Sequence, residues 1–168
     1  SQFDHYTVEY TFADGTKLFT FSRHMHGCWE TYADYAHGSK GSAVLMATLG
    51  EPRPKIYKGH HQTAENLLWE FAGRDPNPYV VEWQRLLDAI RQDKPHNEAR
   101  RAGEADIAAL MGRMATHSGQ FITWDQAMNS QFQFVADIDR MTFDTHAPIH
   151  VGPNGLYAPP QPGITKEY

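Results

Sequence analysis

Alternating apolar and polar residues mark the first part of the chain as β-structure. Every second residue between 5 and 12 is large and apolar, and an Asp-Gly turn leads into a second strand over 17–25. A third strand is predicted over 41–48, where both faces are apolar, so we expect it at the centre of a sheet. A short fourth strand is predicted over 55–58, while residues 64–72 fit either a strand or a helix.

The pattern then changes to helical spacing. An Asn-Pro pair opens a helix predicted over 77–94, in which apolar residues recur every three or four positions. A second helix is predicted over 97–119, with a glycine as its C-cap, and a capping box opens a short helix over 123–128. We expect Trp124 to be buried at the edge of the core. Residues 148–163 are rich in Pro and Gly and predict an extended tail.

This order of elements predicts an α+β fold for residues 1–168 as a single domain. We expect an open, mostly antiparallel sheet with helices packed on one face and an extended Pro-rich C-terminal tail. The face predicted to lie under the helices carries Tyr6, Val8, Tyr10, Phe12, Phe19 and Phe21. The opposite face is predicted to be the interface of a homo-oligomer, because both faces of the third strand are apolar and neither is suited to contact with solvent.

Composition narrows the functional classes. The 168 residues carry a net charge of −5 with scattered Lys and Arg, which argues against a nucleic-acid partner. No apolar run reaches the length of a membrane span, so we predict no membrane partner. One cysteine, Cys28, excludes an internal disulfide. The first strand follows residue 1 almost at once, without a start methionine or signal peptide, so we expect a domain excised from a longer protein.

Histidines and one arginine are the first candidates for chemistry. His24 and His26 lie two residues apart and would share a strand face, so they could ligate a metal together with His60 or Cys28. The alternative, which we prefer, is that these histidines are solvated or line a polar pocket, and we predict no metal. Arg23 interrupts an apolar strand face, where it would form an ion pair or anchor a substrate.

Several motifs of enzymes are missing from the sequence. It contains no strand followed by G-x-G-x-x-G and a helix, no Walker A loop, no G-x-S-x-G and no H-E-x-x-H. Because backbone amides of a Gly-rich turn hold a dinucleotide pyrophosphate, we expect this chain to bind no nicotinamide cofactor by itself.

An ordered series of short motifs lies between residues 77 and 130. It comprises Asn77-Pro78-Tyr79 with Glu82, Leu87-x-x-Ile90-Arg91, Pro95-x-Asn97-Glu98, Met111-Gly112-Arg113-Met114-Ala115, Gly119-Gln120 and the segment 123–130. The series resembles the C-terminal domain of Gfo/Idh/MocA-type oxidoreductases, particularly the bacterial subgroup with a Pro-rich C-terminal tail. The β-rich first part of the chain is similar to the sheet of that domain.

The resemblance implies a substrate-side and oligomerisation domain of an NAD(P)-dependent oxidoreductase that acts on a sugar, inositol or related polyol. Its partner would be its own N-terminal Rossmann domain, which would hold NAD or NADP and the catalytic lysine. His5 and Asp4 approximate the catalytic histidine and acid of the family. Arg23, Tyr79 and Glu82 are the predicted substrate-binding residues. The compartment would be the cytoplasm, or the periplasm if a twin-arginine signal precedes the chain.

Two other functions stay open at this point. The chain could be a stand-alone binding or scaffold domain that has the same fold and performs no redox chemistry. It could also be a His-rich metal-dependent hydrolase, the least favoured of the three.

Overall fold

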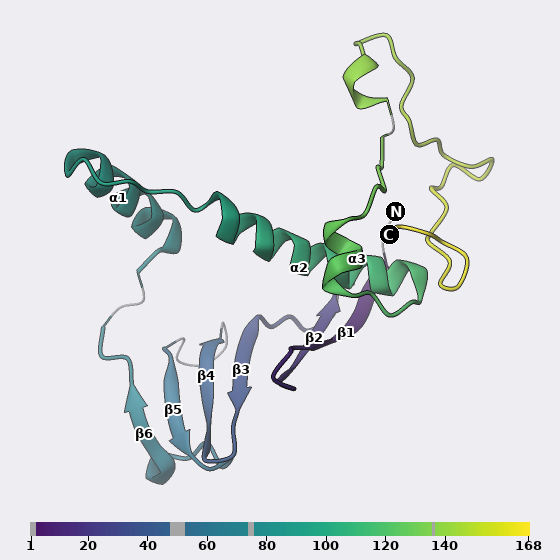
Figure 1. Ribbon diagram of the computed structural model, residues 1–168. Helices are drawn as coiled ribbons and strands as arrows, with labels where there is room; N and C mark the ends of the chain where they lie inside the picture. The colour runs from purple at the N-terminus through teal and green to yellow at the C-terminus, as the bar shows by residue number, and fades with distance from the viewer. Residues whose placement is uncertain (1–2, 48–52, 74–75, 136) are drawn as a thin grey trace. The chain divides into compact units, whose positions relative to one another are not determined.

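The computed structural model describes residues 3–47, 53–73, 76–135 and 137–168, which form two compact units (Figure 1). Unit 1 joins Ser1–His26 to Asn97–Tyr168, and unit 2 comprises Gly27–His96. Helices and antiparallel strands make the fold α+β, as predicted. The strands form two sheets in place of the single sheet that we expected, and each unit contains one of them.

Unit 1 begins with the predicted hairpin. Strand β1 (His5–Thr11) pairs along its whole length with β2 (Lys17–Arg23). In the turn, Asp14 Oδ1 accepts a hydrogen bond from the Thr16 amide at 2.9 Å. Gly15 has a φ of 85°, a conformation that glycine adopts without a steric cost. The Asp-Gly pair therefore marks the turn correctly.

The register of this hairpin corrects the predicted faces. Val8 lies opposite Thr20, and Glu9 lies opposite Phe19. Because opposed residues share a face, Phe19 and Phe21 belong to the side that points away from α2. Their exposed fractions are 54% and 77%, so the prediction that they lie under the helices is wrong. Alternation within one strand is local, but the phase between two strands is set by the turn that joins them.

Two helices complete unit 1. Helix α2 (Ala99–Ser118) ends at Gly119, whose left-handed φ of 69° confirms the predicted C-cap. Helix α3 (Trp124–Met128) begins with the predicted capping box. The buried core consists of Met114, Ile122 and Ala127, with Ile107, Met111 and Ala115 packed against them. Trp124 is 41% exposed, so the prediction of a buried ring is wrong; Ala127 is the residue of α3 that enters the core.

Tyr10 and Gly112 join β1 to α2. The Tyr10 hydroxyl donates a hydrogen bond to the Ala108 carbonyl at 3.0 Å. A Cβ at position 112 would lie 2.3 Å from that hydroxyl oxygen and 3.6 Å from Val8 Cγ2. The helix therefore reaches β1 this closely because residue 112 has no side chain.

Unit 2 contains a four-stranded antiparallel sheet and a helix. The strands in spatial order are β3 (Ala33–His37), β4 (Gly41–Ala47), β5 (Lys55–Lys58) and β6 (Leu67–Glu70). Strand β4 has a neighbour on each side, as predicted, and residue 48 lies outside the described residues. Strand β3 was not predicted. The ambiguous segment 64–72 holds a short 3-10 helix, Ala64–Asn66, followed by β6.

Helix α1 (Pro78–Arg91) is the other element of unit 2. The Asn77 side chain accepts a hydrogen bond from the Tyr79 amide at 3.0 Å, which confirms the predicted N-cap. The helix ends three residues before the predicted boundary at Lys94.

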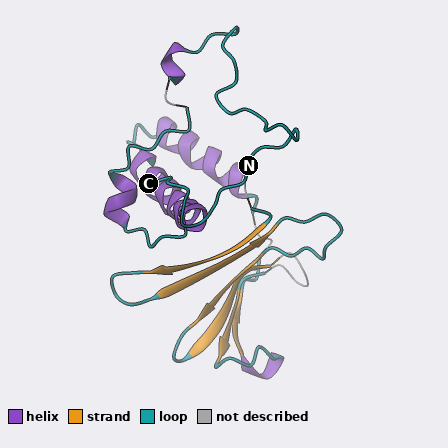
Figure 2. Ribbon diagram, turned by 90° about the vertical axis from the view of Figure 1, so that its right-hand side faces the viewer, coloured by secondary structure: helices purple, strands orange, loops and turns teal. Residues whose placement is uncertain are grey.

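The chain after α3 is almost entirely irregular (Figure 2). Among the described residues of this part, the short 3-10 helix Ile138–Arg140 is the one regular element. Residues 148–163 contain neither helix nor strand, as predicted. Among the residues that the structure describes, no helix has the length and apolar character that crossing a bilayer requires.

Candidate functional site

Asp4 and His5 form a hydrogen-bonded pair at the open end of the β1–β2 hairpin. His5 Nδ1 lies 2.7 Å from Asp4 Oδ1, and both side chains are exposed. The Asp4 carbonyl accepts a hydrogen bond from the His24 amide at 2.6 Å, which holds the segment beside the end of β2. A carboxylate at Nδ1 favours the tautomer with its proton on that atom, so Nε2 is left to accept a proton.

Arg23 and Phe21 lie beside this pair, on the face of the hairpin that points away from α2. The register places Arg23 directly opposite His5 and Phe21 opposite Thr7. His5, Arg23 and Phe21 therefore share one face. Arg23 is exposed and does not lie in a buried apolar layer, the setting that would have required a buried ion pair. Three of the five predicted site residues thus come together.

Tyr79 and Glu82 are the other two predicted residues. Both are exposed on α1, in unit 2, whereas Asp4, His5 and Arg23 belong to unit 1. The part of the predicted site that lies within one unit therefore consists of Asp4, His5 and Arg23.

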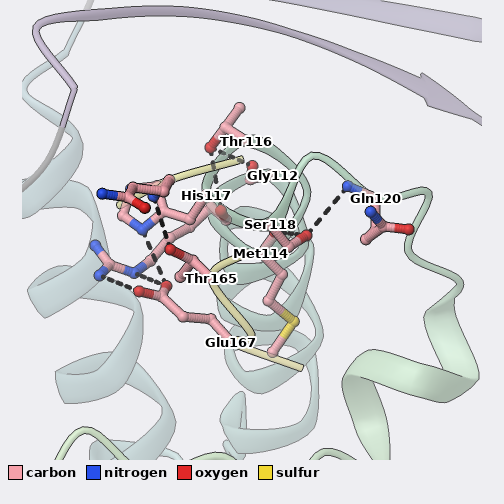
Figure 3. A network of polar contacts seen from close by, with 10 residues as sticks. Gly112, Met114, Thr116, His117, Ser118, Gln120, Thr165 and Glu167 are labelled. Carbon is pink, nitrogen blue, oxygen red and sulfur yellow. Dashed lines mark hydrogen bonds and ion pairs between the residues drawn. The ribbon is translucent and has the colours of Figure 1, made fainter. Parts of the chain in front are cut away.

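A buried ionic cluster in unit 1 was not predicted (Figure 3). Glu167 Oε2 lies 3.0 Å from Arg113 Nε and 3.0 Å from His117 Nδ1, and Glu167 Oε1 lies 3.4 Å from Arg113 Nη2. The His117 and Glu167 side chains are only 5% and 12% exposed. The spacing of four residues between Arg113 and His117 places both on one side of α2, and this was the only part of the cluster that the sequence could have indicated.

The ionic cluster also contacts Phe3, which lies just before β1. The Phe3 ring packs edge-on against the His117 ring, with centroids 5.4 Å apart. Since Phe3 comes directly before the Asp4–His5 pair, this contact anchors the chain next to the candidate site. On the other side of the cluster, Arg113 lies 4.5 Å from the centre of the Phe134 ring.

The residues considered as metal ligands are divided between the two units. His24 and His26 belong to unit 1, while Cys28 and His60 belong to unit 2, and all four are exposed. Within the described ranges, no group of three or more His, Cys, Asp or Glu side chains could hold a metal ion. His60 instead stacks on His37, with their Nδ1 atoms 3.2 Å apart.

A shallow hollow of about 410 Å³ lies on the four-stranded sheet of unit 2. His37, Lys40 and Tyr57 are among its lining residues, and most of the others are small or apolar. None of the predicted site residues lines this hollow, so we do not assign the predicted chemistry to it.

Comparison with known proteins adds no assignment. No protein-family model matches the chain, and no similar chain was found among curated proteins or solved structures. The resemblance to Gfo/Idh/MocA-type oxidoreductases therefore stays a prediction.

Proposed function

We propose that this chain is the substrate-side domain of an NAD(P)-dependent oxidoreductase acting on a sugar, inositol or related polyol. His5, held by Asp4, would transfer the proton of the reacting hydroxyl group. The observation that carries the proposal is the 2.7 Å contact between His5 Nδ1 and Asp4 Oδ1 on an accessible face.

The chemistry of alcohol oxidation calls for such a pair. Oxidation of a secondary alcohol removes a proton from oxygen and a hydride from carbon, and it leaves a ketone. His5 Nε2 would accept the proton, while Asp4 would orient the ring and stabilise its protonated form. The hydride would pass to a nicotinamide held by a separate Rossmann domain, since the sequence has no Gly-rich dinucleotide motif.

The neighbouring side chains support a carbohydrate or polyol as the substrate. Phe21 offers an exposed aromatic surface on the same face as His5 and Arg23. Small-molecule sites commonly combine aromatic surface with a few placed polar groups. Phe21 would contact the apolar C–H side of the substrate, and Arg23 would donate hydrogen bonds to its hydroxyl oxygens.

The test is NAD(P)-linked oxidation of a panel of sugars and inositols by the protein that includes the dinucleotide-binding domain. We expect His5→Gln to lower kcat by about 10²–10⁴-fold, with a small change in KM. Asp4→Asn should lower kcat less, and Phe21→Ala should raise KM. His150→Ala, a change of an exposed histidine in the tail, is the matched control. Unchanged turnover of His5→Gln would contradict the proposal.

A binding domain without redox chemistry is the second candidate, because the hairpin face could hold a polyol without any proton transfer. Calorimetry on this chain separates the two. If Phe21→Ala weakens polyol binding while the protein with its dinucleotide-binding domain shows no NAD(P)-linked turnover, the binding function is favoured.

Tight binding of NAD or NADP to the chain alone would contradict the expectation that the cofactor is held elsewhere. The hairpin face of the proposed substrate site shares only its β1 residues with the face that we predicted as an oligomer interface.

A further inference from the structure

The C-terminal segment 161–168 is bound at several points to the last two turns of α2. Glu167 contacts both Arg113 and His117 in the ionic cluster. The Gly163 amide donates a hydrogen bond to the Ser118 carbonyl at 2.6 Å, and so satisfies a carbonyl at the end of the helix. These contacts combine charge with backbone hydrogen bonding, and they define a specific binding site for the segment. We call this site the tail dock.

The close fit of the tail dock extends to the helix C-cap. A Cβ at Gly119 would lie 3.0 Å from Pro162 Cβ and 3.1 Å from the Gly163 amide nitrogen. The segment therefore packs directly against the cap residue, where a side chain would displace it.

The chain that leads to this segment makes mainly local contacts. Between residues 137 and 160, the described hydrogen bonds join residues no more than four positions apart. We call residues 137–160 the tether. Fully extended, such a stretch spans about 80 Å, which exceeds the diameter of a domain of this size. The tether is therefore long enough to carry the segment either to its own α2 or to that of a second copy.

Several large apolar side chains of the tether are exposed. These exposed large apolar side chains are Ile138, Met141, Phe143, Ile149, Val151, Leu156 and Tyr157. Solvated linkers are normally polar, and a concentration of exposed apolar side chains marks an interaction surface. A second copy that lies along the tether would remove these side chains from water.

We propose that two copies of this chain exchange their C-terminal segments, so that Glu167 of each copy enters the tail dock of the other. The dock contacts are the same within one chain and between two chains, and they cancel in the comparison. The equilibrium between monomer and dimer then depends on the tether. Burial of its apolar side chains in the dimer offsets the entropy lost on association. We expect a dimer that dissociates on dilution, since docking within one chain competes with exchange.

Charge reversal tests the exchange. Arg113→Glu places two carboxylates in the dock, and Glu167→Arg places two guanidinium groups there, so each variant opposes docking within its own chain and within its own dimer. When the two variants are mixed, exchange gives every dock one Arg and one Glu. We expect native mass spectrometry to detect a one-to-one mixed dimer, with each variant alone mainly monomeric. Lys166→Glu, an exposed neighbour, is the control and should leave the wild-type dimer intact.

The wild-type chain gives an independent result if either variant folds poorly. Sedimentation should show a monomer–dimer equilibrium that Phe143→Ser and Leu156→Ser shift toward monomer, because both side chains are exposed in one copy. A wild-type chain that is monomeric up to about 1 mM, the effective concentration of a short flexible linker, would overturn the proposal. A dimer insensitive to Glu167→Arg and to both tether changes would also overturn it, and would favour the sheet face.

Discussion

Gly112→Ala tests the packing of α2 on β1. The added Cβ would lie 2.3 Å from the Tyr10 hydroxyl oxygen but 3.4 Å from Tyr10 Cζ. The hydroxyl group must therefore move, while the ring carbon is already at ordinary contact distance. Moving the hydroxyl also breaks its 3.0 Å hydrogen bond to the Ala108 carbonyl.

The expected change in the free energy of unfolding follows from three contributions. Overpacking costs about 1–3 kcal/mol, and the lost hydrogen bond costs about 0.5–1.5 kcal/mol. Replacing a glycine inside a helix by alanine contributes about 1 kcal/mol in the opposite direction. Gly112→Ala should therefore destabilise unit 1 by about 0.5–3.5 kcal/mol.

The sign of this effect should reverse when Tyr10 is replaced by Phe. Without the hydroxyl group, Gly112→Ala meets no atom closer than ordinary contact and should stabilise the protein by up to about 1 kcal/mol. Gly103→Ala on the same helix is the matched control, because a Cβ there meets no atom within 4 Å. Denaturant unfolding and hydrogen exchange of the α2 amides measure the change, and exchange reports on unit 1 separately. If Gly112→Ala stabilises the wild type as much as Gly103→Ala does, α2 does not approach β1 as described.

Three further predictions concern charge and pH. Glu167→Gln should lower the melting temperature of unit 1 and reduce its free energy of unfolding by about 1–3 kcal/mol, because Arg113 and His117 lose their carboxylate partner. Lys166→Gln is the control and should change the melting temperature little. Burial raises the pKa of Tyr10, so the contribution of Tyr10 to stability is complete below about pH 10 and is lost as the pH rises through the raised pKa. Tyr10→Phe should reduce the slope of the unfolding free energy against pH in this alkaline range. Equal slopes for the variant and the wild type would refute the prediction. The Thr16 amide lowers the pKa of Asp14, so its contribution is present above the ordinary pKa of aspartate and is lost as the pH falls through the lowered value; an NMR titration showing an ordinary pKa would contradict this.

Local features of the fold were predictable from the sequence. The Asp-Gly turn, the Asn77 cap, the capping box and the Gly119 C-cap each depend on a few consecutive residues. Strand β3 was missed because it has only five residues, and its sequence Ala-Asp-Tyr-Ala-His does not alternate cleanly between apolar and polar side chains. The predicted face of Phe19 and Phe21 was wrong because the face of a residue in β2, relative to β1, depends on how the two strands pair.

At the candidate site, too, only contacts between residues close in the sequence could be predicted. Asp4 and His5 are adjacent in the sequence, so their pairing needs only the local backbone. The ionic cluster joins Glu167 to α2 residues 50 and 54 positions away. No periodic pattern links positions so far apart, because the intervening tail is irregular and its path is set by tertiary contacts.

His117 links the candidate site to the tail dock. Its ring contacts Phe3, which directly precedes the Asp4–His5 pair, and its Nδ1 contacts Glu167. If the tails exchange, the segment before each candidate site is supported by a carboxylate from the partner copy. Dilution would then loosen the support of the pair while its own residues stay intact. The proposals are nevertheless separable, because His5→Gln removes the proton acceptor without touching the tail dock, and Glu167→Arg disrupts the tail dock without changing the proton acceptor.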